Sequence, residues 1–139
     1  MKLVEVKKNL FTVDDSYYLA HCIATDLRMG AGIAVDMQKK FGLRNQIIKQ
    51  NMNIKNPAVI LTGRVFNLIT KRKSSGKPTY HSFTETIKGM QVIAEREGIK
   101  KIAMPKIGCG LDRLQWGRVR DIIDEVFSET DIEILVCKL

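Results

Sequence analysis

The chain has 139 residues, of which 45% are hydrophobic, so we expect one core and a single domain over residues 1–139. Its longest apolar runs have the length of strands, which excludes a membrane-spanning helix, and the N-terminal stretch MKLVEVKKNL lacks the apolar segment of a signal peptide. The 23 Lys and Arg residues exceed the 15 Asp and Glu residues, and a formal net charge of +8 favours a polyanionic, phosphate-bearing partner, although a solvated basic surface explains the charge equally well.

The first half of the chain predicts two strands and then two helices. Alternating apolar and polar residues in KLVEVKK predict a strand, and the apolar run YYLAHCIA predicts an inner strand that is covered on both faces. Apolar residues between Ile33 and Ile48 then predict two short helices, with a break near Gly42.

The second half predicts a hairpin followed by alternating helices and strands. The runs PAVILTG and RVFNLITK predict a hairpin that turns at Gly63. Apolar residues at spacings of three and four predict a helix from Thr79 to about Glu97, and Gly98 is a C-terminal stop. The remaining predicted elements are a strand in KKIAMPKIG, a helix with an apolar stripe from Trp116 to Phe127, and a last strand in IEILVCKL.

This alternation predicts a layered α/β domain with a mixed sheet between helices. In such sheets, ligands bind in the loops beyond the carboxyl ends of the strands. Two glycine-rich stretches, RMGAGIA and KIGCGLD, each follow a predicted strand and precede a helix, so they could hold two phosphates. Each stretch alone is also explained by tight strand-to-helix packing. A Walker loop is excluded at SSGKPT, because Lys71 replaces its first glycine and Pro78 its Ser or Thr.

Asp112 and Lys71 each allow a structural and a chemical interpretation. Asp112 with Gln115 three residues later fits a helix capping box, but beside a bound phosphate ligand it could act as an acid or base. Lys71 ends an apolar strand and is either a surface charge or a nucleophile. The second role requires that desolvation or a neighbouring cation lowers its pKa.

The cysteines and the central histidine are interpreted as structural. Cys22, Cys109 and Cys137 form neither a CxxC pair nor a zinc site with nearby histidines, which fits a reducing compartment, the cytoplasm or nucleus. His21 and Cys22 lie in the predicted inner strand, and we see no carboxylate placed to complete a Cys/His nucleophile. Cys109 fits a small residue packed under a loop. We expect no metal and no cofactor.

Taken in order and at their separation, RMGAGIA and PKIGCGLDRLQW resemble the macrodomains and, within them, the terminal ADP-ribose protein glycohydrolases. The resemblance begins at VKKNLF, includes LITKRKSSGKPTY and extends over nearly the whole chain. It implies a three-layer α/β/α fold with a central mixed sheet. It also implies a hydrolase that removes mono-ADP-ribose from glutamate or aspartate esters on proteins and that deacylates O-acetyl-ADP-ribose.

The resemblance assigns roles to residues. The lysine of LITK, the attacking amine of the family, carries over to Lys71, and the aspartate of GCGLD, which resolves the intermediate, carries over to Asp112. An amine can condense with the aldehyde of an opened sugar, and a carboxylate can assist its release. The substrate-binding residues implied in this way are Asn9, Leu10, Gly30, Ala31, Gly32, Ile33, Ala34, Gly108, Cys109, Gly110 and Leu111.

One departure from the family pattern lies near the N-terminus. Where the family has Gly-Asp before LF, with the aspartate recognising the adenine amino group, this chain has Lys8 and Asn9. The Asn9 oxygen can accept the same hydrogen bond without the assistance of a charge.

The expected partners are ADP-ribose and mono-ADP-ribosylated proteins, bound by a monomer away from membranes. Three alternatives stay open. One is a reader that binds ADP-ribose without turnover, which would not need Lys71 together with Asp112. Another is a hydrolase of ADP-ribosylated DNA, which the positive charge favours. The third is a nucleic-acid-binding domain of similar fold, although no dense Lys/Arg cluster is interleaved with aromatic residues.

Overall fold

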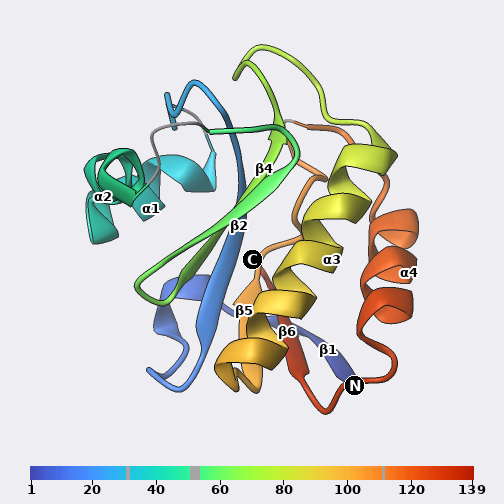
Figure 1. Ribbon diagram of the computed structural model, residues 1–139. Helices are drawn as coiled ribbons and strands as arrows, with labels where there is room; N and C mark the ends of the chain where they lie inside the picture. Colours follow the sequence, from blue (N-terminus) through green and yellow to red (C-terminus); the bar gives the residue numbers. More distant parts are fainter. Residues whose placement is uncertain (31, 51–53, 111) are drawn as a thin grey trace.

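The computed structural model describes residues 1–30, 32–50, 54–110 and 112–139, and over these residues the chain forms one six-stranded mixed sheet with helices on both faces (Figure 1). β3 runs antiparallel to β4, and the other neighbouring strands are parallel. In spatial order the strands are β1 (Lys2–Lys7), β6 (Glu133–Lys138), β5 (Lys101–Met104), β2 (Tyr18–Ala24), β4 (Val65–Lys71) and β3 (Ala58–Thr62).

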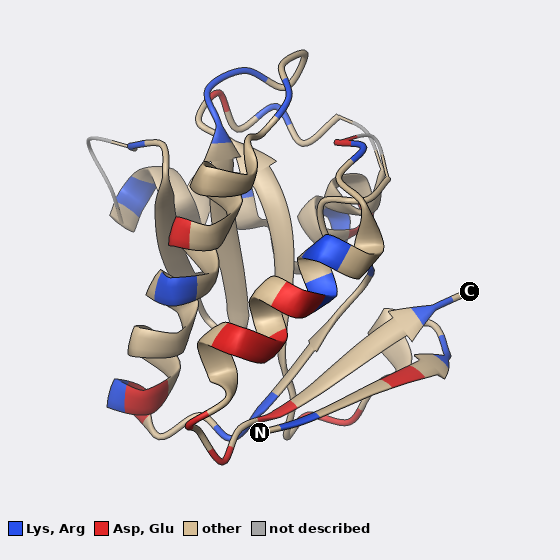
Figure 2. Ribbon diagram, turned by 90° about the vertical axis from the view of Figure 1, so that its right-hand side faces the viewer, with Lys and Arg blue, Asp and Glu red and all other residues tan. Residues whose placement is uncertain are grey.

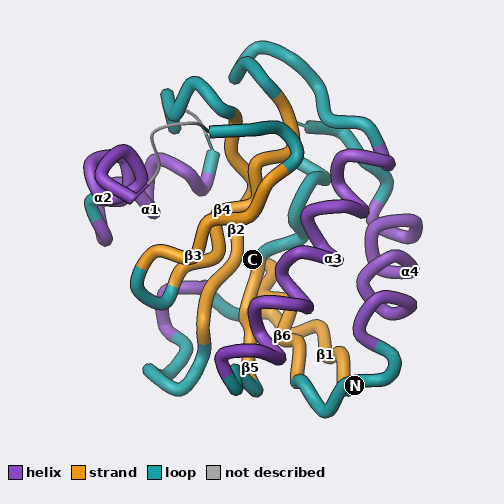
Figure 3. The backbone as a smooth tube through the Cα atoms, in the orientation of Figure 1, coloured by secondary structure: helices purple, strands orange, loops and turns teal. Residues whose placement is uncertain are grey.

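The helices lie in two layers, with α1 and α2 on one face of the sheet and α3 and α4 on the other (Figure 3). This confirms the predicted three-layer α/β/α fold and the predicted order of strands and helices. A short 3-10 helix, η1, is an element that the sequence did not predict. The helices are η1 (Leu10–Thr12), α1 (Ile33–Phe41), α2 (Leu43–Gln50), α3 (Tyr80–Glu97) and α4 (Trp116–Phe127).

α3 has the boundaries that its sequence predicts. The Thr79 hydroxyl accepts a hydrogen bond from the Ser82 N–H at 2.9 Å, and the Ser82 hydroxyl accepts one from the Thr79 N–H at 3.1 Å. This capping box satisfies N–H groups that the first helical turn leaves free. The helix ends at Gly98, whose φ of +70° is a left-handed conformation that glycine adopts without steric cost.

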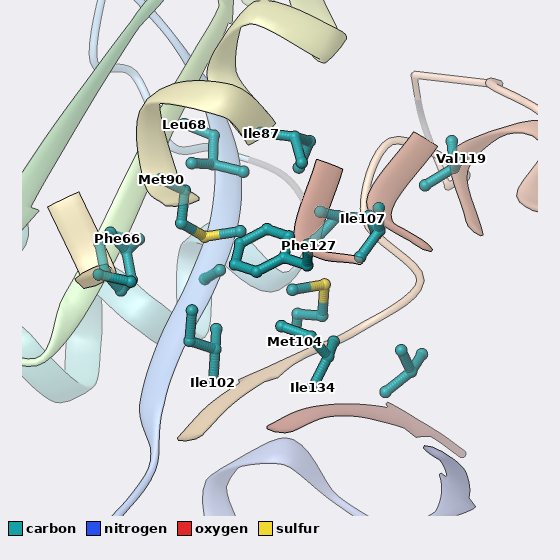
Figure 4. Close-up of a cluster of buried hydrophobic side chains, with 14 of the residues drawn as sticks. Phe66, Leu68, Ile87, Met90, Ile102, Met104, Ile107, Val119, Phe127 and Ile134 are labelled. Atoms are coloured by element: carbon teal, nitrogen blue, oxygen red, sulfur yellow. The ribbon is translucent and has the colours of Figure 1, made fainter. Parts of the chain in front are cut away.

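The central strands are buried on both faces of the sheet. Along β4, Phe66 and Leu68 point into the core under α3 and α4, whereas Val65 and Ile69 point into the core under α1 and α2, and all four are fully buried. Figure 4 shows the first of these cores, where the labelled side chains of α3, α4 and β4–β6 meet. Burial on both faces is typical of parallel strands between two helix layers.

The capping interpretation of Asp112 is wrong. α4 begins at Trp116 with Gln115 as its N-cap, and Gln115 makes no side-chain capping hydrogen bond. The chain turns back on itself before the helix can start, because Arg113 has a φ of +60° and the Leu114 N–H donates to the Gly108 carbonyl at 2.7 Å. Asp112 therefore stays in the loop.

No helix in the described part of the chain combines the length and the apolar character needed to cross a membrane.

Candidate active site

A cleft of about 290 Å³ opens at the carboxyl ends of β2, β4 and β5. Its walls come from the loops that follow these three strands, and two of them are the glycine-rich loops singled out in the sequence. We call it the glycine-loop cleft. Of the predicted site residues, it is lined by Gly30, Gly32, Ile33, Ala34, Lys71, Gly108, Gly110 and Asp112.

Lys71 and Asp112 face each other at the base of this cleft. The Lys71 Nζ atom lies 2.6 Å from Asp112 Oδ1, and each side chain is 12% exposed. Lys71 Nζ also donates to the carbonyl oxygens of Ser74 and Gly76, both at 3.2 Å. An ammonium has three N–H bonds, and here three acceptors meet them. The pair is shielded from water, so its geometry is better fixed than that of an exposed ion pair.

A register shift in the sheet sets the position of Lys71. Ile23 of β2 pairs with Ile69 of β4, but the next residue, Ala24, pairs with Lys71, so Thr70 is skipped in the pairing. Such a bulge re-aims the side chains that follow it and recurs next to active sites. The Thr25 N–H then donates to the Lys71 carbonyl at 3.0 Å, which fixes the end of β4 at the cleft.

Asp26 ties the first glycine loop to the turn that holds the Lys71 amine. Its carboxylate accepts hydrogen bonds from the Ser74 N–H at 2.8 Å, the Ser74 hydroxyl at 2.7 Å and the Arg28 N–H at 3.1 Å. Partial desolvation acts to raise the pKa of Asp26, but these hydrogen bonds prevail and hold it below its ordinary value. Since Ser74 presents a carbonyl to Lys71, Asp26 supports the position of the amine indirectly.

The first glycine loop has a strained backbone that its surroundings hold in place. Leu27 and Met29 have φ angles of +53° and +49°, a conformation that costs a non-glycine residue about 1 kcal/mol or more. Both side chains are buried in the core under α1 and α2. From α2, the Arg44 Nε atom donates to the Leu27 carbonyl at 2.7 Å, and its Nη2 atom donates to the Arg28 carbonyl. Arg44 therefore fixes the loop from behind the cleft.

The second glycine loop is shaped by apolar packing. A Cβ atom on Gly108 would lie 3.0 Å from Leu114 Cδ1, and its φ is +75°, so this position requires glycine. Gly110, like Gly30 in the first loop, has no atom within 4 Å of the place that a Cβ would occupy. Cys109 is partly buried against the core, and this desolvation raises the pKa of its thiol. It packs under the loop as predicted and does not line the glycine-loop cleft.

His21 is structural, as predicted, and Cys22 is not an activated nucleophile. The His21 Nε2 atom lies 2.7 Å from Asn67 Oδ1, and complete burial lowers the pKa of the imidazole to about 4. Cys22 lines the glycine-loop cleft, which its place in an apolar strand did not indicate. Burial raises the pKa of its thiol well above the ordinary value, so the thiol stays protonated at neutral pH.

A second hollow of about 890 Å³ adjoins the first, and the two share Ile33, Pro105 and Lys106 as lining residues. Asn9 and Leu10 line this second hollow and not the first, and of the other predicted binding residues that the structure describes, Ile33 is the one that lines both. The Asn9 Oδ1 atom accepts a hydrogen bond from the Phe11 N–H at 2.9 Å and so caps η1. We call this hollow the lysine cleft after five of its lining residues, Lys8, Lys39, Lys40, Lys106 and Lys138.

Two predicted binding residues, Ala31 and Leu111, lie outside the described residues. Within the described ranges, no group of three or more His, Cys, Asp or Glu side chains is gathered as a metal site would require.

The sequence did not point to the residues that hold the reactive pair. Asp26, Arg44, Ser74 and Gly76 act through hydrogen bonds between segments that lie far apart in the sequence or through backbone carbonyls. No local motif marks such contacts. The one sequence signal for Ser74 and Gly76 was the SSG stretch at residues 74–76, in the turn that follows the strand ending at Lys71.

Known proteins resemble this chain in sequence and in fold. The family model described as "Macro domain" matches residues 20–123. The chain is similar to "ADP-ribose glycohydrolase OARD1" of Homo sapiens, with 44% identity over 140 residues, 99% of this chain and 92% of that protein. Among solved structures, the macrodomain of Thermus aquaticus DarG superposes with a TM-score of 0.84 and 21% identity over 99% of this chain and 98% of that one. Thermosipho africanus DarTG in complex with ADP-ribose gives a TM-score of 0.79 and 18% identity over 99% of this chain and 42% of that one.

Proposed function

Because this chain belongs to the macro domain family, we propose that its two adjoining clefts bind ADP-ribose and that it is an ADP-ribose glycohydrolase. The 44% identity with the human ADP-ribose glycohydrolase OARD1 over nearly the full length of both proteins supports this activity. The observation that carries the proposal is the shielded contact between Lys71 and Asp112 at 2.6 Å, between the two glycine loops.

The proposed ligand, ADP-ribose, extends through both clefts. The glycine loops hold the diphosphate, because exposed backbone N–H groups near a helix start attract phosphate oxygens. The distal ribose then lies toward Lys71 and Asp112, and the adenosine lies in the lysine cleft beside Asn9 and Leu10. The continuity of the two hollows through Ile33 and Pro105 supports this placement.

In the proposed reaction, Lys71 first loses a proton to Asp112, its neighbour at 2.6 Å. The neutral amine attacks C1″ of the distal ribose, the C1″–O bond breaks, and the target side chain leaves as a carboxylate with the electron pair of that bond. The nitrogen bound to C1″ then loses a proton to water, and the C1″–O4″ bond breaks to leave an iminium while Asp112 returns its proton to O4″ and becomes a carboxylate again. Asp112 then takes a proton from the water that adds to C1″, and the amine departs with a proton as ADP-ribose is released.

The proposed substrates are glutamate and aspartate esters of mono-ADP-ribose on proteins, since a carboxylate leaves without needing a proton from the enzyme. Deacylation of O-acetyl-ADP-ribose is proposed for the same cleft. Hydrolysis of ADP-ribosylated DNA is the second candidate. Arg72 and Lys73 favour it, because they are exposed on the loop after β4, beside the glycine-loop cleft, where Figure 2 shows a concentration of positive residues.

The experiment that tests the proposal measures ADP-ribose released from a protein with glutamate-linked mono-ADP-ribose and from ADP-ribosylated DNA. We expect release from the protein, and the relative rates decide between the two candidates. The matched variants are Lys71→Ala, which should be inactive, and Lys49→Ala, which removes an exposed lysine that lines neither cleft. Binding of ADP-ribose without release from either substrate would leave only the reader alternative.

A further inference from the structure

The lysine cleft carries more positive charge than the proposed ligand would neutralise. Among its lining residues, all of which lie in the described part of the chain, the carboxylates are those of Asp36 and of the C-terminal residue Leu139, against five lysines. Lys138 is paired with Glu5, with 3.5 Å between Nζ and Oε1. The other four form no ion pair with a carboxylate within the described residues: Lys8, Lys39, Lys40 and Lys106.

These lysines converge on one hollow from separate parts of the fold. Lys8 follows β1, Lys39 and Lys40 lie in the last turn of α1, and Lys106 follows β5. The Lys40 ammonium lies 5.5 Å from the centre of the Phe11 ring, and the Lys106 ammonium lies 5.8 Å from that of Trp116. Such aromatic contacts orient a cation without cancelling its charge. Like charges gathered around a concave surface raise the local potential and attract an anion.

Lys106 lines both clefts and can face the diphosphate of ADP-ribose, which the glycine loops hold under the proposed function. Lys8, Lys39 and Lys40 line the lysine cleft alone, so the diphosphate does not account for their charge. Adenosine is uncharged, so the part of the ligand next to the lysines would leave them without a counter-charge. Asn9, next to Lys8 in the lining of this cleft, is uncharged and adds no negative charge at this end of the site. The charge therefore fits a ligand with one more anionic group at its adenosine end.

We propose that the lysine cleft binds a phosphate ester on the adenosine of the bound nucleotide, so that the chain prefers ADP-ribose phosphorylated at that end over ADP-ribose itself. This inference rests on the proposed function. The shared chemistry is a phosphate on the adenosine ribose, whether a terminal monoester or a diester that continues into a second nucleotide.

Titration calorimetry with three probes tests the inference: ADP-ribose, ADP-ribose 2′-phosphate, and ADP-ribose joined through a phosphodiester at its adenosine to one further nucleotide. We expect at least one phosphorylated probe to bind about tenfold more tightly than ADP-ribose, because several weak exposed charge contacts add up. The probe that binds more tightly identifies the ester. Equal affinity for all three probes would overturn the inference while leaving the proposed function intact, whereas no binding of ADP-ribose would overturn the proposed function.

The matched variants remove two positive charges each. Lys8→Gln/Lys39→Gln should abolish the preference for the phosphorylated probe, because the affinity for that probe falls by more than the affinity for ADP-ribose. Lys49→Gln/Lys88→Gln removes two exposed lysines that do not line either cleft, and it should keep the preference. A preference that falls equally in both double variants would mean that the net charge of the protein attracts the probe, and this would overturn the assignment to the lysine cleft.

Discussion

The two adjoining clefts differ in how they hold their charged groups. At the base of the glycine-loop cleft, Lys71 and Asp112 contact each other and are mostly shielded from water. In the lysine cleft, the ammonium groups are exposed, and most have no carboxylate partner within the described residues. A contacting acid and amine can exchange a proton, whereas separated cations can only attract an anion. Under the proposed function, the first cleft carries out the reaction, and the second recognises the adenosine end of the ligand.

Lys71→Ala should have the largest effect, because it should remove turnover and leave ligand binding. Without the amine no covalent intermediate forms, so we expect turnover to fall by about a thousandfold or more. Affinity for ADP-ribose should stay within about threefold, because the glycine loops and the lysine cleft are unchanged. Release assays and calorimetry measure the two effects. The variant leaves Asp112 without its partner, so a thermal melt has to accompany them. Normal turnover in this variant would reject the covalent mechanism.

Acid should weaken the fold beneath both clefts through His21. Its pKa is lowered from 6.5 to about 4, so between these values the unfolded chain takes up a proton that the folded chain does not. Stability is then complete above about pH 6.5 and should fall by about 3 kcal/mol as the pH drops toward 4. Denaturant unfolding across this range measures the slope. His21→Gln should flatten it, and the exposed control His81→Gln should not; an equal slope in all three proteins would contradict the assignment to His21.

A side chain on a glycine loop should weaken binding without affecting the fold. The position of a Cβ on Gly30 or Gly110 is open space, so Gly30→Val and Gly110→Val should melt near the wild-type temperature. We expect affinity for ADP-ribose to fall about tenfold, because the side chain enters the space of the diphosphate. Gly108→Ala is the contrast, since its Cβ would meet Leu114 and should destabilise the protein. Unchanged affinity in both valine variants would reject this placement of the ligand.

Asn9→Asp should have the smallest effect, and it tests how the lysine cleft recognises adenine. A carboxylate still accepts the Phe11 N–H and offers a charge-assisted hydrogen bond to the adenine amino group, so ADP-ribose should bind a few-fold more tightly. The added negative charge should also reduce any preference for the phosphorylated probe. Calorimetry with both ligands checks this. Affinities that do not change would mean that the family's role for this position does not apply to Asn9.

The sequence predicted the fold well because its signals are local. The apolar run of β2, the spacing of three and four along α3 and its stop at Gly98 each specify an element without reference to the rest of the chain. These periodic patterns predict the elements correctly because the apolar side chains that form them pack on both faces of the sheet. η1 escaped prediction because a single turn has no periodicity to read.

The candidate site was predictable only in part. The resemblance to macrodomains named Lys71 and Asp112, but capping was a competing explanation for Asp112 that local sequence alone could not exclude. The positive φ of Arg113 and the contact of Leu114 with Gly108, which delay α4, arise from tertiary packing. The support from Asp26 and Arg44 likewise joins segments that no motif connects. The lysines of the lysine cleft come from separate elements, so the composition indicated a positive surface but not where on the protein the charge lies.

The most direct test of covalent catalysis by Lys71 is the intact mass of Asp112→Ala after incubation with an ester-linked mono-ADP-ribosylated protein. Water can accept the proton of the Lys71 amine, so the attack on C1″ should still occur in this variant. No nearby described group replaces the carboxylate in activating water for release, so the covalent adduct should accumulate. We expect an added ADP-ribose on Lys71, located by peptide mapping and absent from Lys71→Ala/Asp112→Ala. Continued turnover without any adduct on Lys71 would contradict the covalent account and favour direct attack by water.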